Sequence, residues 1–121
     1  MTTINTSTTI LNDYTVADLI VIREAAAQHA RDAAEAHLEQ YGEQAYCGFA
    51  WVNIYGIKGN TKLGKRMKAA GFEKDYTGAY SIWNPSGVGT QCMSTKEAGA
   101  DAAAKVYKAA GFTAYAGSRA D

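Results

Sequence analysis

Hydrophobic residues recur at two different periods along this chain, and the two periods predict helices and strands. Between Thr15 and Gly42 the apolar side chains return every three or four residues, which is the spacing of one helical face. Thr15 and Asp18 have the spacing of a helix N-terminal capping pair, and Gly42 is a typical helix stop. We expect a helix of about 26 residues, roughly 39 Å long. Its alanine-rich face lets another backbone come close, so the helix either spans the sheet or packs on a partner subunit.

A strict alternation follows in residues 47–55, which read Cys-Gly-Phe-Ala-Trp-Val-Asn-Ile-Tyr. In a strand, successive side chains point to opposite faces. One face then carries small and aliphatic residues and suits packing against helices. The other face carries two large rings, an amide and a phenol (Phe49, Trp51, Asn53 and Tyr55). This second face is either another core or a surface that contacts a different molecule.

The remaining pattern predicts two shorter helices and further strands. The helices cover residues 60–70 and 95–110. A strand or a hairpin covers residues 76–83, and further strands cover residues 90–93 and 112–118. Residues 1–12 are a threonine-rich lead, either an edge strand or an arm. We therefore expect one α+β domain over residues 1–121: a small, mostly antiparallel sheet with the long N-terminal helix and two shorter helices packed on one face.

Local signals mark the ends of the two shorter helices. Asn60 or Thr61 is expected to cap the first, and Ser94 with Glu97 has capping-box spacing at the start of the second. The string Lys-Ala-Ala-Gly-Phe ends both, at residues 68–72 and 108–112. Glycine past a helix end followed by a hydrophobe that folds back explains the repeat. Duplication of a helix–strand unit is the alternative explanation.

Composition indicates one soluble, intracellular domain. The chain has 121 residues, no net charge, and no apolar run near the roughly 18 residues of a membrane helix. Its start lacks the pattern of a signal peptide, so we expect Cys47 and Cys92 to be reduced thiols. No membrane partner is predicted.

The charges are unevenly distributed. Residues 13–43 hold seven acidic and two basic side chains, whereas residues 58–74 hold six basic and one acidic. The two segments either neutralise each other or solvate their own faces. Alternatively, Lys62, Lys65 and Arg66 belong to a basic patch that steers a polyanion toward the aromatic face.

No motif indicates catalysis, a cofactor or a metal. His29 and His37 lie eight residues apart, which is not the spacing of a helical zinc pair. The glycines of residues 87–90 precede a predicted strand, whereas phosphate-binding loops lead into a helix. We expect no catalytic residues, no cofactor and no metal, and the sequence favours a non-enzymatic protein.

The octet 47–54 resembles the signature strand of RNA-recognition motifs, in which the residues matching Phe49 and Trp51 stack on bases. Cys47 replaces the basic residue of that signature and Ile54 its last aromatic residue. That fold also needs two strands between its first helix and this strand, and residues 42–46 leave no room for them. Single-stranded nucleic-acid binding through these two rings, with the basic residues of the second helix, is therefore an alternative function.

A pocket for a small ligand is the other use of the aromatic face. If the central strands pair, polar and aromatic side chains converge at one end of the sheet. The expected ligand-binding residues are Trp51, Asn53, Tyr55, Tyr80, Asn84, Gln91 and Arg119. The competing interpretation is that the amides merely hold turns in place.

Four segments resemble a group of small proteins encoded by tailed bacteriophages. They are Cys-Gly-Phe-Ala-Trp-Val at 47–52, Ser-Ile-Trp-Asn-Pro-Ser-Gly at 81–87, Lys-Glu-Ala-Gly-Ala at 96–100 and Ala-Gly-Phe-Thr-Ala-Tyr-Ala-Gly-Ser-Arg at 110–119. The resemblance covers roughly residues 45–121 and implies a setting, the infected bacterial cytoplasm or the virion, without an activity.

The leading hypothesis is therefore a phage accessory protein that binds a host protein or a small-molecule ligand through its aromatic and polar sheet surface. Besides nucleic-acid binding, the remaining alternative is a virion structural or assembly component. In that role the threonine-rich arm and the alanine seam of the long helix would form a homo-oligomer.

Overall fold

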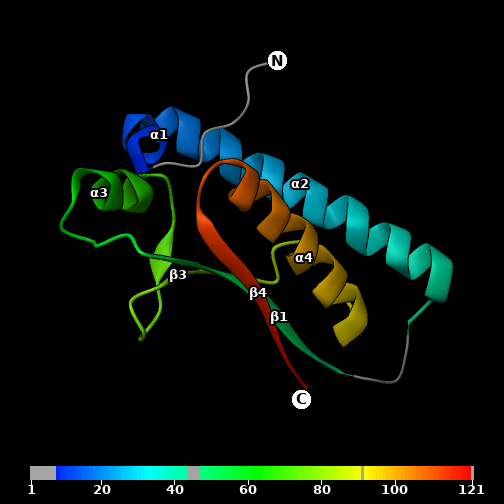
Figure 1. Cartoon of the computed structure of the whole chain (residues 1–121). Helices are drawn as coiled ribbons and strands as arrows, with labels where there is room; N and C mark the ends of the chain where they lie inside the picture. The colour runs from blue at the N-terminus through cyan, green and yellow to red at the C-terminus, as the bar shows by residue number, and fades with distance from the viewer. Residues whose placement is uncertain (1–7, 44–46, 91, 121) are drawn as a thin grey trace.

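The computed structural model describes residues 8–43, 47–90 and 92–120, which form four helices and four strands (Figure 1). The helices are α1 (Thr8–Asp13), α2 (Val16–Tyr41), α3 (Lys62–Ala69) and α4 (Met93–Ala109). The strands are β1 (Gly48–Tyr55), β2 (Glu73–Lys74), β3 (Tyr80–Trp83) and β4 (Thr113–Ala120). The chain is an α+β protein, as predicted.

The four strands form one antiparallel sheet in the order β2-β3-β1-β4. From β1 onward the chain runs β-α-β-β-α-β, and β3 is inserted between the strands that flank α3. This is the split β-α-β, or ferredoxin-like, arrangement. The helices α1 and α2 precede that unit as an N-terminal addition.

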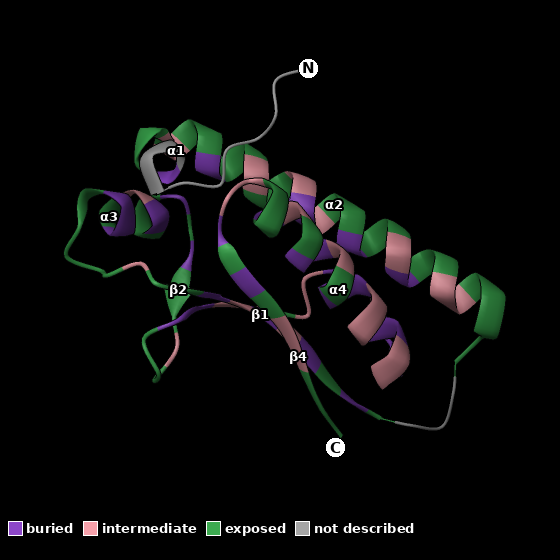
Figure 2. Ribbon diagram, in the orientation of Figure 1, coloured by how far each residue is buried: buried purple, intermediate pink, exposed green. Residues whose placement is uncertain are grey.

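Strand β1 alternates as its sequence predicts (Figure 2). Ala50, Val52 and Ile54 are almost completely buried under α4, together with Ala114 of β4. The rings and the amide of β1 point to the opposite face. Both long helices lie on the inner side of the sheet, and no helix of the described residues covers the outer face (Figure 1).

Helix α2 begins and ends where its caps require. Thr15 accepts a hydrogen bond from the backbone nitrogen of Asp18, whose carboxylate accepts one from the backbone nitrogen of Thr15. Hydrogen bonding from the Thr15 backbone nitrogen, and then from the Thr15 hydroxyl, holds the pKa of the Asp18 carboxyl below its usual value. Gly42 ends the helix with a positive φ of 68°, so both predicted boundaries are confirmed.

The alanine seam of α2 packs on α4. Ala26, Ala30 and Ala34 are buried there, and a Cβ at Gly99 of α4 would come within 3.1 Å of the Ala30 carbonyl oxygen. The seam is thus used within the chain. The seam, expected to contact either the sheet or a partner subunit, contacts α4, and a homo-oligomer through the long helix stays a prediction.

The two Lys-Ala-Ala-Gly-Phe strings form the same helix end twice. Gly71 and Gly111 have φ values of 98° and 101°, which glycine adopts without strain. The backbone nitrogens of Phe72 and Phe112 each donate to a carbonyl five residues back, as in a Schellman motif. Both phenylalanine rings pack edge-on against Tyr107, at 6.0 and 6.1 Å between centroids. The helix ends are therefore also anchors of the core.

Three local predictions are wrong. Residues 8–12 belong to helix α1 rather than to an edge strand, while residues 1–7 lie outside the described part. Residues 92–93 form no strand, because Cys92 makes only an isolated bridge with Cys47 before α4 begins at Met93. No side chain caps α4. The Glu97 carboxylate accepts a hydrogen bond from Ser118 of β4 instead, a long-range contact that the capping pattern did not indicate.

Helix α3 lies tightly against the loop that precedes it. Thr61 caps it by accepting from the backbone nitrogen of Gly64 at 3.0 Å. A Cβ at Gly64 would overlap the Lys58 carbonyl oxygen and lie 2.9 Å from Cα of Gly59. The close approach is between backbones, so a side chain at this position requires the helix to move.

We therefore expect Gly64→Ala to lower the free energy of unfolding by about 1–3 kcal/mol, the usual cost of an overpacked site. Urea denaturation measures the change. Gly89→Ala is the matched control, because a Cβ there meets no atom within 4 Å, and its free energy of unfolding should stay the same or rise slightly. Equal stabilities of the two variants would contradict the tight packing of α3.

Candidate functional site

The outer face of the sheet carries a continuous surface of aromatic rings from three strands, which we call the ring face. Its members are Phe49, Trp51 and Tyr55 of β1, Trp83 of β3 and Tyr115 of β4. Trp83 and Tyr115 are each 57% exposed, and Trp51 is half-buried. Exposed rings that adjoin one another in this way are typical of an interaction site.

The first half of the ring face is a cluster around two tryptophans. Trp51 and Trp83 lie directly opposite each other on the two central strands, with ring centroids 5.0 Å apart. Phe49 meets the edge of Trp83 at 6.2 Å. The three rings together form a broad apolar platform.

Gly117 of β4 makes room for that platform. It lies directly opposite Trp51 in the β1–β4 register. A Cβ at Gly117 would come within 2.7 to 2.9 Å of three atoms of the indole. The indole of Trp51 therefore lies over the β4 backbone, where any larger residue would displace it.

The second half of the ring face pairs Tyr55 with Tyr115, whose centroids are 6.1 Å apart. Asn53 lies between the two halves and donates from Nδ2 to the Tyr55 hydroxyl at 3.1 Å. Its Oδ1 is buried and has no hydrogen-bond partner among the described residues. An unsatisfied buried acceptor costs about 1–3 kcal/mol, which a donor from a bound molecule would offset.

Cations lie beside the rings along the β4 side. Arg119 lies opposite Phe49 in the register and is exposed. Lys108 places Nζ 5.2 Å from the Tyr115 centroid, and Lys96 places Nζ 5.2 Å from that of Phe49. Lys96 is buried and donates to the Gly48 carbonyl oxygen at 2.9 Å. These positions favour anionic groups at this edge of the ring face.

The structure brings together four of the expected ligand-binding residues, Trp51, Asn53, Tyr55 and Arg119, on this face. Tyr80 is not with them. The hairpin register pairs it with Ile54, so its side chain is buried on the inner face and donates to the Gly64 carbonyl oxygen at 3.1 Å. Burial raises the Tyr80 pKa above its usual value.

Asn84 follows β3 and holds the turn after it. Its backbone has a φ of 42°, its Oδ1 accepts from the Ser86 hydroxyl at 3.2 Å, and its Nδ2 is 3.5 Å from the Val88 carbonyl oxygen. Asn84 therefore stabilises a turn, which was the alternative to ligand binding for the amide side chains. Gln91 lies outside the described residues.

The basic residues expected to meet a nucleic acid are not on the ring face. Lys62, Lys65 and Arg66 belong to α3, on the inner side of the sheet. Arg66 donates to the carbonyl oxygens of Asn12 and Tyr14 at 2.8 and 3.3 Å. Its guanidinium therefore joins α3 to the last turn of α1 and to the residue that follows this helix.

Trp83 and Tyr115 were not among the candidate site residues, and both belong to the ring face. The missing signal was strand parity in the last segment. Thr113, Tyr115, Gly117 and Arg119 alternate with Ala114 and Ala116, and this alternation identifies an outward face as clearly as the one in residues 47–55 does.

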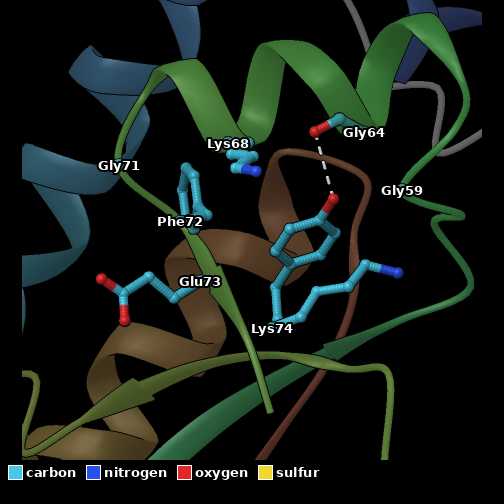
Figure 3. A pocket seen from close by; sticks show the side chains of 8 residues that line it. Gly59, Gly64, Lys68, Gly71, Phe72, Glu73 and Lys74 are labelled. Atoms are coloured by element: carbon cyan, nitrogen blue, oxygen red, sulfur yellow. Dashed lines mark hydrogen bonds between the residues drawn. The ribbon is translucent and has the colours of Figure 1, made fainter. Parts of the chain in front are cut away.

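Five hollows among the described residues lie mostly away from the ring face. One of about 520 Å³ lies between α3 and β2 (Figure 3). None of the five is lined by Asn53 or Tyr55. Trp83 borders two of them, and the other four rings of the ring face border none.

Comparisons with known proteins assign no family. No protein-family model matches the chain, and no curated protein or solved structure matches it significantly. Within the described residues, no three His, Cys, Asp or Glu side chains are grouped to hold a metal ion. No described helix combines the length and the apolar character needed to cross a membrane. The function therefore has to be argued from the ring face itself.

We expect Gly117→Val to push the Trp51 indole away from β4 and separate it from Trp83. The exciton couplet of the two stacked indoles in the far-ultraviolet circular dichroism spectrum should weaken. The free energy of unfolding should change by about 1 kcal/mol or less, because valine suits a strand. Gly89→Val, in open space, is the control and should leave the couplet intact. An unchanged couplet in Gly117→Val would show that the indole does not depend on this glycine.

Proposed function

We propose that this protein binds single-stranded nucleic acid, with bases stacked on the ring face. The observation that carries the proposal is the pair of tryptophans side by side on the two central strands, Trp51 over Gly117 and Trp83 more than half exposed. Proteins that bind single strands use such rings because every base presents a flat π-face.

The shape of the site supports a polymeric ligand. A small molecule binds tightly where a concave pocket encloses most of its surface, and none of the five hollows described above is formed by the ring face. An extended strand can instead lay successive bases on Phe49, Trp51, Trp83, Tyr55 and Tyr115. This favours nucleic acid over the small ligand that the sequence first indicated for the same surface.

The topology removes one objection to this function. Residues 47–54 were compared with the third strand of an RNA-recognition motif, which requires two earlier strands. Here the octet lies on β1, itself a central strand of a four-stranded sheet, and β3 beside it supplies a ring of its own. RNA-recognition motifs stack bases on the two central strands of such a sheet. Fold alone does not assign function, so the argument rests on the rings.

Charge and setting complete the proposal. Arg119 and Lys108 beside the rings suit the phosphates of a stacked strand. Between the two ring clusters, the Oδ1 of Asn53 is a buried acceptor without a partner among the described residues. From the resemblance of its motifs, we propose a bacteriophage protein that acts in the infected cell.

We expect fluorescently labelled oligothymidylate to bind the protein, and Trp51→Ala and Trp83→Ala each to weaken binding roughly 5- to 150-fold, the effect of losing one stacked base. Fluorescence anisotropy measures the affinity, and the quenching of tryptophan emission reports stacking directly. Tyr76→Ala is the matched control, because Tyr76 is fully exposed in the β2–β3 turn, away from the ring face.

Thermal unfolding and circular dichroism establish that each variant is folded. Absence of binding up to high micromolar concentration would overturn the proposal. So would equal affinities of the tryptophan variants and the wild type. Dimerisation in analytical ultracentrifugation that Trp83→Ala abolishes would instead assign the ring face to a second copy of the chain.

A further inference from the structure

A groove follows the short edge of the sheet, on the β2 side. Three adjoining hollows make it up, of about 520, 260 and 370 Å³. The first two share Gly71, Phe72 and Glu73, and the last two share Arg23, Ile82 and Trp83. Because neighbouring hollows have lining residues in common, they lie next to one another from α3 to the end of β3, and we call the three together the groove.

The groove exists because β2 is only two residues long. Glu73 and Lys74 pair with Ser81 and Tyr80, so β2 covers only the first half of β3. Gly71, with a φ of 98°, turns the chain from α3 into β2. Beyond Ser81 this side of β3 has no neighbouring strand among the described residues, and the groove occupies that space.

Trp83 joins the groove to the ring face. Its indole packs on Trp51 and Phe49, and the same residue borders the second and third hollows of the groove. A chain molecule that leaves the ring face at Trp83 therefore enters the groove directly. No other member of the ring face has this position.

The groove is positively charged. Four cationic side chains line it (Arg23, Arg31, Lys68 and Lys74), against two carboxylates (Glu24 and Glu73). All six side chains are exposed. Lys68 and Lys74 belong to the basic segment of residues 58–74. They therefore line the groove and not the ring face.

Lys68 and Lys74 are the cations best placed for a ligand. Figure 3 shows Lys68 extending from α3 into the first hollow of the groove, beside Phe72. Its amine has no hydrogen bond or ion pair to any residue that the structure describes. Lys74 reaches along the floor, with Nζ 5.1 Å from the Tyr80 centroid and 3.2 Å from the Ile57 carbonyl oxygen. One amine is thus available to an anion, and the other lies close by with a single backbone partner.

Building on the proposed function, we infer that the groove is the continuation of the nucleic-acid site. A single strand stacked on the ring face passes over Trp83, and its following phosphates lie in the groove against Lys68 and Lys74. The ring face holds bases and the groove holds backbone, so a longer strand binds more tightly than one that covers the rings alone.

The test compares oligothymidylates of about three and about eight nucleotides, because the rings hold two or three bases and single-strand sites extend over several more. In the wild type the longer strand should bind at least tenfold more tightly at low salt. Lys68→Ala with Lys74→Ala should remove most of that gain and leave the affinity for the short strand unchanged. The slope of log affinity against log salt for the longer strand should fall by roughly 1.4, about 0.7 for each phosphate contact.

Lys62→Ala with Lys65→Ala is the matched control, because it removes the same charge from exposed positions outside the groove. It should leave the salt slope nearly unchanged. Glu73→Gln should strengthen binding of the longer strand only. The single variant Lys68→Ala, which loses no intramolecular hydrogen bond, separates phosphate contact from any effect on folding and should lower the slope by about 0.7.

The outcomes distinguish the two claims. Equal affinities of the short and long strands, or equal losses of slope in the two double variants, overturn the groove and leave base stacking on the ring face intact. Failure of both strands to bind wild-type protein overturns the proposed function itself. Both claims are supported if wild-type protein binds the longer strand more tightly and only the variant with Lys68→Ala and Lys74→Ala loses this difference.

Discussion

Close packing of α2 on α4 is the constraint from which the rest of the molecule follows. Alanines on α2 and Gly99 on α4 let the two backbones approach until the Ala30 carbonyl oxygen is 3.1 Å from where a Gly99 side chain would begin. Helix α2 thereby buries its apolar seam against α4. Since both long helices lie on one side, no described helix covers the outer face of the sheet, and the rings of that face are partly or largely exposed.

An uncovered face of this kind carries an energetic cost that a structural role does not explain. Exposed apolar rings gain nothing from burial in the free protein, and Asn53 keeps an acceptor without a partner beside them. Yet the surrounding residues maintain the arrangement, because Gly117 leaves space for the Trp51 indole and the register places Trp83 alongside it. The combination favours selection for contact with another molecule.

The features predictable from the sequence are those set by neighbouring residues. The parity of residues 47–55, the Thr15–Asp18 cap and the two glycine–phenylalanine helix ends all depend on contacts a few residues apart, and each is confirmed.

Tyr80 was assigned to the wrong face because its orientation depends on a turn. Asp75 accepts from the backbone nitrogens of Thr77 and Ala79, and this closes the hairpin in the register that buries Tyr80. The strand order, the Ser118–Glu97 contact and the groove arise from distant segments, so no local pattern indicates them.

Residues at alternating positions of β1 have different roles. Ala50, Val52 and Ile54 fill the interior, whereas the rings between them contribute little to it. Substitutions at the outward positions therefore change what the surface contacts at small cost to folding. Mutations at the outward positions can therefore change the binding specificity in small steps while the fold is retained. This is an advantage for any protein whose binding partner evolves quickly.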